Sequence, residues 1–526
     1  MLPGMIPFDS TDSEHSCSNL IDITDSDEGI EDHLPESDEW SSNAVTFVER
    51  NIPFTGPCPG PCFPDINPLQ IVKRFLTDEI VDMIVVETNT HSFNERKHAR
   101  RSRDESTDLR KTPCTRDEFW RFLAVLLLVE IHGKPDIDSN WSRNWLLHTP
   151  AFSHIMPLDR FRGLLSGLHF ADDSESDPND KLWKIRRLFE LLRQRLSVAY
   201  NMDRRISVDE SMALWKGNHT LKRYIPKKAS AWGFKFYALA ESTTGYIANF
   251  LVDEGSRTRI PSDASADLKK PGKIVMALMQ PFLDRGHFLA MDNFYTDLVL
   301  FEALVSNNTH CIGTVRKNRR FLPKDIINRK WRKAERGVIV ASYRTNLFIS
   351  CWYDKRPVRI LSSVGNVSIS ENKPLVVRLY NEAMPGVDLA DQKRHSRTIS
   401  LKQLSRWYRR IFFHLIDIIL VNSYCIGQHV PDIMGLTHTK FRLALIDQIV
   451  RVYDVASGSS HVSPHLTGRL IQRHSNLQKA EKARRCVVCT SSGIRTQTKY
   501  FCADCDVALC PSPCFHIHHD TPNIVE

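Results

Sequence analysis

The chain has 526 residues, enough for two to four domains and a sizeable core. Its formal charge of +8 is unevenly spread: residues 1–50 hold 13 acids and one base, a net of −12, so residues 51–526 carry +20. A body this basic favours a polyanionic partner such as nucleic acid, although a soluble protein that is simply basic is the alternative. Six of the 13 cysteines lie within residues 486–514, which is typical of a metal site in a reducing compartment and excludes a disulfide framework.

Residues 1–45 are rich in Asp, Glu and Ser and poor in aromatic residues. Such a composition buries too little apolar surface to offset the entropy of ordering, so we expect a disordered acidic tail. The tail could accept phosphate or repel DNA, and a solubilising role is equally compatible with its composition. An acidic N-terminus without a basic region and an apolar run also predicts that the chain has no secretory signal.

The apolar spacing between residues 65 and 205 is helical, with start signals such as Thr115 followed by Asp117. We expect a helical domain here, completed by helices at about 395–455. The most apolar stretches are residues 122–131 and 411–427; the first is too short to cross a bilayer and the second contains His414 and Asp417. Both are expected to be buried helices, and no membrane association is predicted.

The period changes after residue 205. The pattern predicts strands near 205–213, 233–241, 246–253, 287–292 and 310–315, with helices near 267–283 and 296–306. Three strands followed by alternating helix and strand is the order of an RNase H-like α/β core over residues 206–394. The first and fourth strands are neighbours in that fold, which would bring Asp209 and Asp292 together. Strand alternation is expected to turn Glu210 away from the face of Asp209.

Asp388 and Asp391 follow in the segment YNEAMPGVDLADQ, three residues apart, so both carboxylates project from one face of a helix. Two strand-end acids and a helix acid can hold two divalent ions at a phosphate. Carboxylate oxygens suit Mg²⁺, with Mn²⁺ as an alternative. Strand-end acids that merely cap the next segment are the plainer interpretation, and Asp391 could bind a ligand of the metal instead of the metal itself.

Short alternating segments predict a β insertion at about 321–375, between the last core strand and the helix of the third acid. A basic linker is expected at 455–484, and a cysteine-rich module at 485–522. In that module two CxxC pairs, two further cysteines and histidines have zinc-ligand spacing. The predicted zinc ligands are Cys486, Cys489, Cys502, Cys505, Cys510, Cys514 and His519, with His516 or His518 as the eighth.

These motifs resemble the piggyBac transposase family, which includes domesticated vertebrate relatives. The resemblance rests on DESMALWKG (209–217), LKRYIPKKASAWGFKFY (221–237), AMDNFYT (290–296), GTVRKNR (313–319), YNEAMPGVDLADQ (380–392) and the terminal Cys/His cluster. It implies an RNase H-like DDE/D core with Asp209, Asp292, Asp388 and Asp391 as catalytic metal ligands and an all-β insertion. It also implies a helical region that contributes to dimerisation and DNA binding, and a cysteine-rich domain that recognises transposon ends.

Two basic stretches flank the acids and are candidate phosphate contacts. They comprise Lys222, Arg223, Lys227 and Lys228 in the first, and Arg316, Lys317, Arg319 and Arg320 in the second. A solvated surface loop is the alternative for both, and the second stretch could instead serve nuclear import.

The function that follows is metal-dependent cut-and-paste transposition in the nucleus. By resemblance, the partners are double-stranded transposon ends and a TTAA target, and the protein is a homodimer. The alternative is a domesticated DNA-binding or chromatin protein that keeps the fold without transposing. A third hypothesis takes the zinc module as a ubiquitin-ligase or histone-reader domain, because zinc modules serve several purposes.

Overall fold

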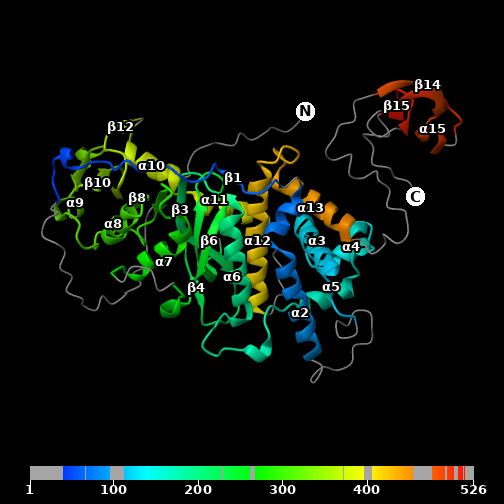
Figure 1. Cartoon of the computed structure of the whole chain (residues 1–526), viewed down its shortest axis with the longest axis horizontal. Coiled ribbons are helices and arrows are strands. Elements are labelled where there is room, and N and C mark those ends of the chain that lie inside the picture. The colour runs from blue at the N-terminus through cyan, green and yellow to red at the C-terminus, as the bar shows by residue number, and fades with distance from the viewer. Residues whose placement is uncertain are drawn as a thin grey trace. The chain divides into compact units, whose positions relative to one another are not determined.

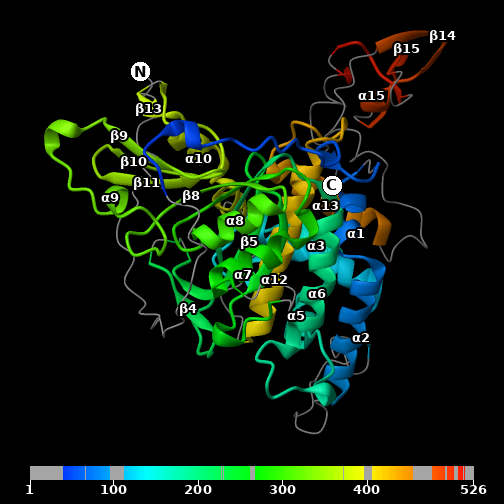
Figure 2. The same cartoon turned by 60° about the vertical axis from the view of Figure 1, so that its left-hand side comes forward.

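The computed structural model describes residues 40–64, 67–94, 112–226, 228, 230–260, 267–370, 372–395, 406–453, 477–491, 494–502, 507–512 and 514–515. Figures 1 and 2 show a central sheet with helices on its faces and a helical layer beyond it. The first helices of the chain are α1 (Pro68–Phe75), α2 (Asp78–Asn94), α3 (Arg116–His132), α4 (Pro150–Ile155), α5 (Leu158–Gly167) and α6 (Trp183–Val198).

Helix α3 shows how the sequence sets these boundaries. The Thr115 side chain accepts a hydrogen bond from the Glu118 backbone N–H, which satisfies a donor that the first turn leaves free. The helix ends at Gly133, whose φ of 57° is the left-handed conformation that favours glycine. The expected start at Thr115 is confirmed.

The strands of the central sheet lie in the order β4-β5-β3-β7-β8-β11-β10-β9, and β6 also pairs with β5. Strands β3 and β7 are parallel neighbours, as are β7 and β8, whereas β5 is antiparallel to β3 and β6. The bounds are β3 (Arg205–Leu214), β4 (Lys222–Tyr224), β5 (Trp232–Glu241), β6 (Ile247–Val252), β7 (Phe288–Met291) and β8 (His310–Thr314). The five expected strands are therefore present, and the first and fourth of them are neighbours.

Helices α7 (Lys270–Met279) and α8 (Leu298–Ser306) fall within or close to their expected ranges. The insertion supplies β9 (Ile339–Tyr343), β10 (Phe348–Tyr353) and β11 (Pro357–Ser362). Because β11 pairs antiparallel with β8, the insertion extends the central sheet and does not form a separate one. It also contains a short helix, α9 (Lys324–Ile327), so it is not wholly β. The small pairs are β1 (Gly60–Pro61) with β2 (Tyr200–Asn201), and β12 (Ile369–Ser370) with β13 (Lys373–Pro374).

Helix α12 (Trp407–Gly427) runs between the sheet and the helical layer, and α13 (His438–Tyr453) packs on α3. The Asn422 amide donates to the Ile247 carbonyl (2.8 Å) and accepts from its N–H (2.9 Å), and Arg410 donates to the Leu214 carbonyl. Among the described helices, α12 is long and apolar enough to span a membrane, but 94% of its apolar window is buried inside the protein. Its apolar surface thus belongs to the core, as expected.

The segment from Trp40 to Phe47 corrects the expected end of the acidic tail at residue 45. The Trp40 indole N–H donates to the Phe321 carbonyl (2.8 Å), Ser41 pairs with Tyr343, and the Phe47 ring packs edge-on against Phe348. The two aromatic residues at the ends of this short segment supply its contacts, whereas residues 1–39 contain a single aromatic residue, Phe8. Residues 1–39 lie outside the described part of the chain.

The C-terminal module contains β14 (Leu477–Arg485), α15 (Val487–Ser491), β15 (Gln497–Cys502) and β16 (Val507–Ala508). Its strands pair in the order β14-β15-β16. Strand β14 begins inside the range expected to be a linker, 455–484, so the module starts earlier than predicted. The apolar pattern does not predict β14, because its sequence, LQKAEKARR, forms an exposed edge strand without alternating apolar residues.

Candidate active site and metal centres

The ends of two parallel strands bring the first two predicted acids together. The register pairs Val208 with Met291, so Asp209 and Asp292 follow at the same edge of the sheet. Strand β7 stops there because Asp292 organises a turn: its carboxylate accepts from the Phe294 N–H (2.8 Å) and its carbonyl from the Thr296 hydroxyl (2.8 Å). Strand β3 continues to Leu214 alongside β5 alone.

Glu210 joins these two acids, contrary to the expectation that it turns away. Carboxylate oxygens of Asp209, Glu210 and Asp292 lie within 4.8 Å of one another. The pairing of β3 with β7 ends at Val208, and just beyond it the Glu210 carboxylate lies beside those of Asp209 and Asp292. An acidic pair placed just past the end of a neighbouring strand is the signal that could have indicated this.

Helix α11 (Gly386–His395) carries the other two acids and lies directly against β3. A Cβ atom on Gly386 would be 2.6 Å from the Ser207 hydroxyl oxygen, so the close approach of this helix requires glycine. From this position Asp388 reaches the strand-end acids through one cation. Lys228 Nζ lies 2.9 Å from Asp388 Oδ1 and 3.2 Å from Asp209 Oδ2.

Asp391 is held differently from the other acids. Its Oδ1 accepts hydrogen bonds from the Ser211 hydroxyl (2.7 Å) and from Arg394 (2.9 Å), and only 12% of its side chain is exposed. It is not among the three carboxylates that meet at the strand ends. Neither role that the sequence left open is seen here, because the partners Ser211 and Arg394 are not predicted metal ligands; the geometry favours a residue that positions α11 on β3.

Burial controls the charge of the cluster. It raises the pKa of Asp209 well above its usual range, against the opposing charge of Lys228. Burial and the charge of Glu210 raise the pKa of Asp292 to about 7. Burial also opposes ionisation of Glu210, but the Lys235 ammonium and hydrogen bonds from Asp209, Lys235 and Tyr295 lower its pKa to about 2. Buried carboxylates that resist ionisation gain strongly from a cation, so the arrangement fits a divalent ion with oxygen ligands.

Some of the predicted DNA-contacting residues make contacts within the protein, and others are exposed to solvent. Arg316 donates to the Asn293 side chain (3.0 Å) and Arg319 to the Asn293 and Phe294 carbonyls, so both hold the turn that carries Asp292. Arg223 pairs with Asp253 at 3.0 Å, and Lys222 Nζ lies 5.0 Å from the centre of the Trp232 ring. Lys317 and Arg320 are exposed, and Lys227 lies outside the described residues.

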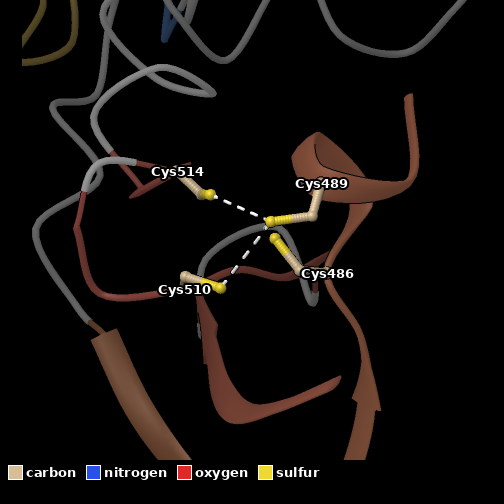
Figure 3. A group of neighbouring side chains, drawn as sticks. All are labelled: Cys486, Cys489, Cys510 and Cys514. Atoms are coloured by element: carbon tan, nitrogen blue, oxygen red, sulfur yellow. Dashed lines mark hydrogen bonds between the residues drawn. The ribbon is translucent and has the colours of Figure 1, made fainter. Parts of the chain in front are cut away.

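Four cysteines of the C-terminal module converge in Figure 3. The sulfur atoms of Cys486, Cys489, Cys510 and Cys514 lie within 4.8 Å of one another, with Cys489 at 3.5 Å from Cys514 and 4.0 Å from Cys510. Burial opposes ionisation of Cys486, but backbone hydrogen bonds from Cys489 and Cys510 lower its pKa to about 7. Four thiols in one cluster match a structural tetrahedral zinc site.

This cluster joins the first cysteine pair to the last one. Cys502 is buried on β15 outside the group of four. The remaining predicted zinc ligands, Cys505 and His519 with His516 or His518, lie outside the described residues. Their assignment therefore stays a prediction.

A third polar group consists of His91, His169 and Asp173. It is better explained as a structural hydrogen-bond network than as a metal site. The two imidazole rings stack at 3.9 Å with an interplanar angle of 4°, so their in-plane lone pairs do not converge on one point. Each ring contacts a different oxygen of Asp173, at 2.8 and 3.0 Å, and Lys184 lies 3.0 Å from the same carboxylate.

Comparison with known proteins identifies the family. A family model described as Transposase IS4 matches residues 67–424, and a second, described as a DDE_Tnp_1-like zinc finger, matches residues 464–520. The chain belongs to the piggyBac family. The first match spans the helices from α1 to α11, the central sheet and every predicted acid, and the second covers the cysteine cluster.

Relatives within the family are distant. Human PiggyBac transposable element-derived protein 3 is 25% identical over 470 residues, which cover 84% of this chain and 74% of that protein. Human PiggyBac transposable element-derived protein 2 is 23% identical over 384 residues, covering 68% and 61% respectively. A cryo-EM structure of a piggyBac transposase synaptic complex with hairpin DNA matches with a TM-score of 0.68 and 23% identity, covering 86% of this chain and 98% of that one. The shared fold therefore extends over most of the chain.

Proposed function

We propose that this protein is a DNA transposase of the piggyBac type, which cleaves and joins DNA strands with divalent metal at TTAA sites. The observation that carries the proposal is the meeting of Asp209, Glu210 and Asp292 at the strand ends, with Asp388 linked to them through Lys228. The strand order β6-β5-β3-β7-β8, with β5 antiparallel, supports an RNase H-like core.

Asp209, Asp292 and Asp388 are the residues that would hold Mg²⁺ or Mn²⁺, with Glu210 as a further candidate. Such ions polarise the attacking and leaving oxygens of a phosphate. The chain's own contribution is position: β3 and β7 fix two carboxylates, and the close contact of Gly386 with Ser207 fixes the helix of the third. Asp391 and Arg394 hold that helix in register on β3.

DNA would be bound by the basic body, for which the net charge of +20 after residue 50 is the support. Exposed Lys317 and Arg320 are chain neighbours of Arg316 and Arg319, which contact the turn of Asp292, and they are the best placed of the predicted phosphate contacts. We assign recognition of transposon ends to the zinc module, whose exposed strand β14 carries four of the basic residues. A homodimer acting in the nucleus completes the proposal.

The test is cleavage of DNA that carries the ends flanking this gene. The full chain with Mg²⁺ should nick those ends and leave a 3′-hydroxyl, and Asp209→Asn should bind the same DNA without nicking it. Plasmids with scrambled ends serve as the control. Specific binding without any nicking in Mg²⁺ or Mn²⁺ would instead support a domesticated DNA-binding protein, an alternative that the names of the human relatives favour.

A further inference from the structure

Lys228 differs from the other cations that contact the predicted acids and Glu210. Lys235, the partner of Glu210 at 3.1 Å, lies in strand β5, and Arg394, the partner of Asp391, lies in helix α11. Lys228 lies on the connection between β4 and β5, outside any strand or helix. Its backbone as well as its side chain can therefore move away from the acids without breaking a strand–strand hydrogen bond.

The Lys228 ammonium lies between two of the predicted metal ligands. It contacts Asp209 on β3 and Asp388 on α11, two acids from separate elements that have no hydrogen bond to each other among the described contacts. The Lys228 side chain is 19% exposed and that of Asp388 37%, so the ammonium lies on the solvent side of the buried strand-end acids. A cation placed between two carboxylates cancels the repulsion that would otherwise separate them.

We propose that Lys228 exchanges with a divalent metal ion: it bridges Asp209 and Asp388 in the metal-free protein and is displaced when these acids bind the ion. The inference rests on the proposed function in one respect, the assignment of these acids as metal ligands. The reason for exchange is that the ammonium and the ion need the same carboxylate oxygens. A monovalent and a divalent cation within a few ångströms of each other also repel strongly at a partly buried site.

Two consequences follow. Lys228 keeps the acids assembled before metal arrives, so the site does not need the ion in order to form. It also lowers the apparent affinity for the ion, because binding must first displace the ammonium. Removing the charge of Lys228 should therefore increase the affinity for the metal ion and lower the stability of the metal-free protein.

The experiment is a titration with Mn²⁺, followed by the electron paramagnetic resonance signal of the free ion. It uses the zinc-loaded full chain, with binding to Asp209→Asn subtracted to isolate this site. Lys228→Met should bind Mn²⁺ at least about tenfold more tightly than the unmodified chain. Its melting temperature should be lower without metal and should rise more on addition of Mn²⁺. Lys216→Met removes the same charge from an exposed residue of the neighbouring segment and should change neither quantity.

Lys228→Arg keeps the charge and should bind Mn²⁺ no more tightly than the unmodified chain, which covers the case in which the methionine variant fails to fold. Equal or weaker Mn²⁺ binding by Lys228→Met would overturn the exchange and leave the proposed function intact. Tight binding by the arginine variant would also overturn it. If neither the unmodified chain nor Lys228→Met binds Mn²⁺ through Asp209, the proposed function and the exchange both fail.

Discussion

The acid cluster and the cysteine cluster are two metal-ligand sites built in opposite ways. The acids sit on strands and a helix of a large core, and lysine side chains pair with three of them, Asp209, Glu210 and Asp388, without any metal. The cysteines sit in a three-stranded module whose buried core consists of Leu509, Phe515, Cys502 and two of the clustered cysteines, Cys486 and Cys514. Removing the ion should therefore leave the first site folded and unfold the second.

The difference indicates which role metal has in each place. In the core, folding free energy comes from apolar burial, and the ligands are positioned before the ion arrives. In the module the apolar residues are too few, so the free energy of metal binding becomes the free energy of folding. Each of the following predictions either sharpens this contrast or would remove it.

Removal of zinc should have the largest effect. A structural zinc site of this kind contributes on the order of 10 kcal/mol, so a strong chelator should unfold the module completely. Amide exchange measured by mass spectrometry should lose protection over β14, β15 and β16 and keep it over β3, β5 and β7. The double variant Cys486→Ser, Cys489→Ser should behave like the chelated chain. Retained protection in the module would show that its fold does not depend on the ion.

Loss of any one of the three acids assigned to hold the metal should abolish strand cleavage without loss of fold. Asp209→Asn, Asp292→Asn and Asp388→Asn should each reduce strand cleavage about a hundredfold or more, because each removes a charged group from the reacting centre. Binding of end DNA, measured by a mobility shift, should stay within a factor of about two, since none of these residues donates to a phosphate. A parallel loss of binding and cleavage would mean that the acids are structural.

Substitution of Asp391 should lower the stability of the fold, in contrast to substitution of the other three acids. Asp391→Asn removes the charge that faces the buried Arg394 guanidinium and should destabilise the protein by about 2 kcal/mol, measured by chemical denaturation. Substitution of the exposed Asp177, which lies far from the cluster in sequence, is a matched control and should cost less than about 0.5 kcal/mol. An unchanged stability with lost cleavage would return Asp391 to the set of direct metal ligands.

The metal-free core should lose stability as the pH rises from about 4 to about 7. The folded pKa of Asp292 is about 7, above the value of about 4 for an exposed aspartate, so the folded state holds a proton that the unfolded state has lost. Asp292→Asn should therefore melt about 2 °C higher than the unmodified chain at pH 8 without metal, and the two should converge near pH 4. Scanning calorimetry at both pH values checks this, and a lower melting temperature for the variant at pH 8 would contradict it.

The acidic tail should have the smallest effect on either fold. Deleting residues 1–39 should leave the melting temperature unchanged and raise DNA affinity at low salt, with the difference fading above physiological ionic strength. Deleting residues 1–47 should lower the melting temperature, because it also removes the contacts of Trp40 and Phe47 with the insertion. Equal melting temperatures for the two deletions would show that residues 40–47 do not stabilise the fold.

Periodicity was sufficient to predict the fold where burial repeats along an element. The strands around Asp209 and Asp292 and the buried helix at 411–427 follow from apolar patterns alone. Strand β14 does not, because its pairing with β15 uses backbone groups while its charged side chains remain exposed. The short edge strand β4 lies within a basic stretch, and its apolar pattern does not predict it either.

The candidate site was predictable to the level of residue type and order. Which acids touch depends on where a neighbouring strand stops, and the end of β7 at Met291 is what admits Glu210. The separation of Asp391 from the cluster depends on two partners, Ser211 and Arg394, one of which lies about 180 positions earlier. Side-chain pairing over such distances leaves no trace in local spacing.

Helix α12 has a consequence for the order in which the chain can fold during synthesis. It packs on α1 and α6, yet 332 residue steps separate Phe75 at the end of α1 from Trp407 at the start of α12. At about 5–20 residues per second, a ribosome needs roughly 20 to 60 seconds to supply the partner that covers the first helices. Nascent chains should expose the apolar faces of these helices throughout that interval, and termination anywhere before Gly427 should yield an insoluble product.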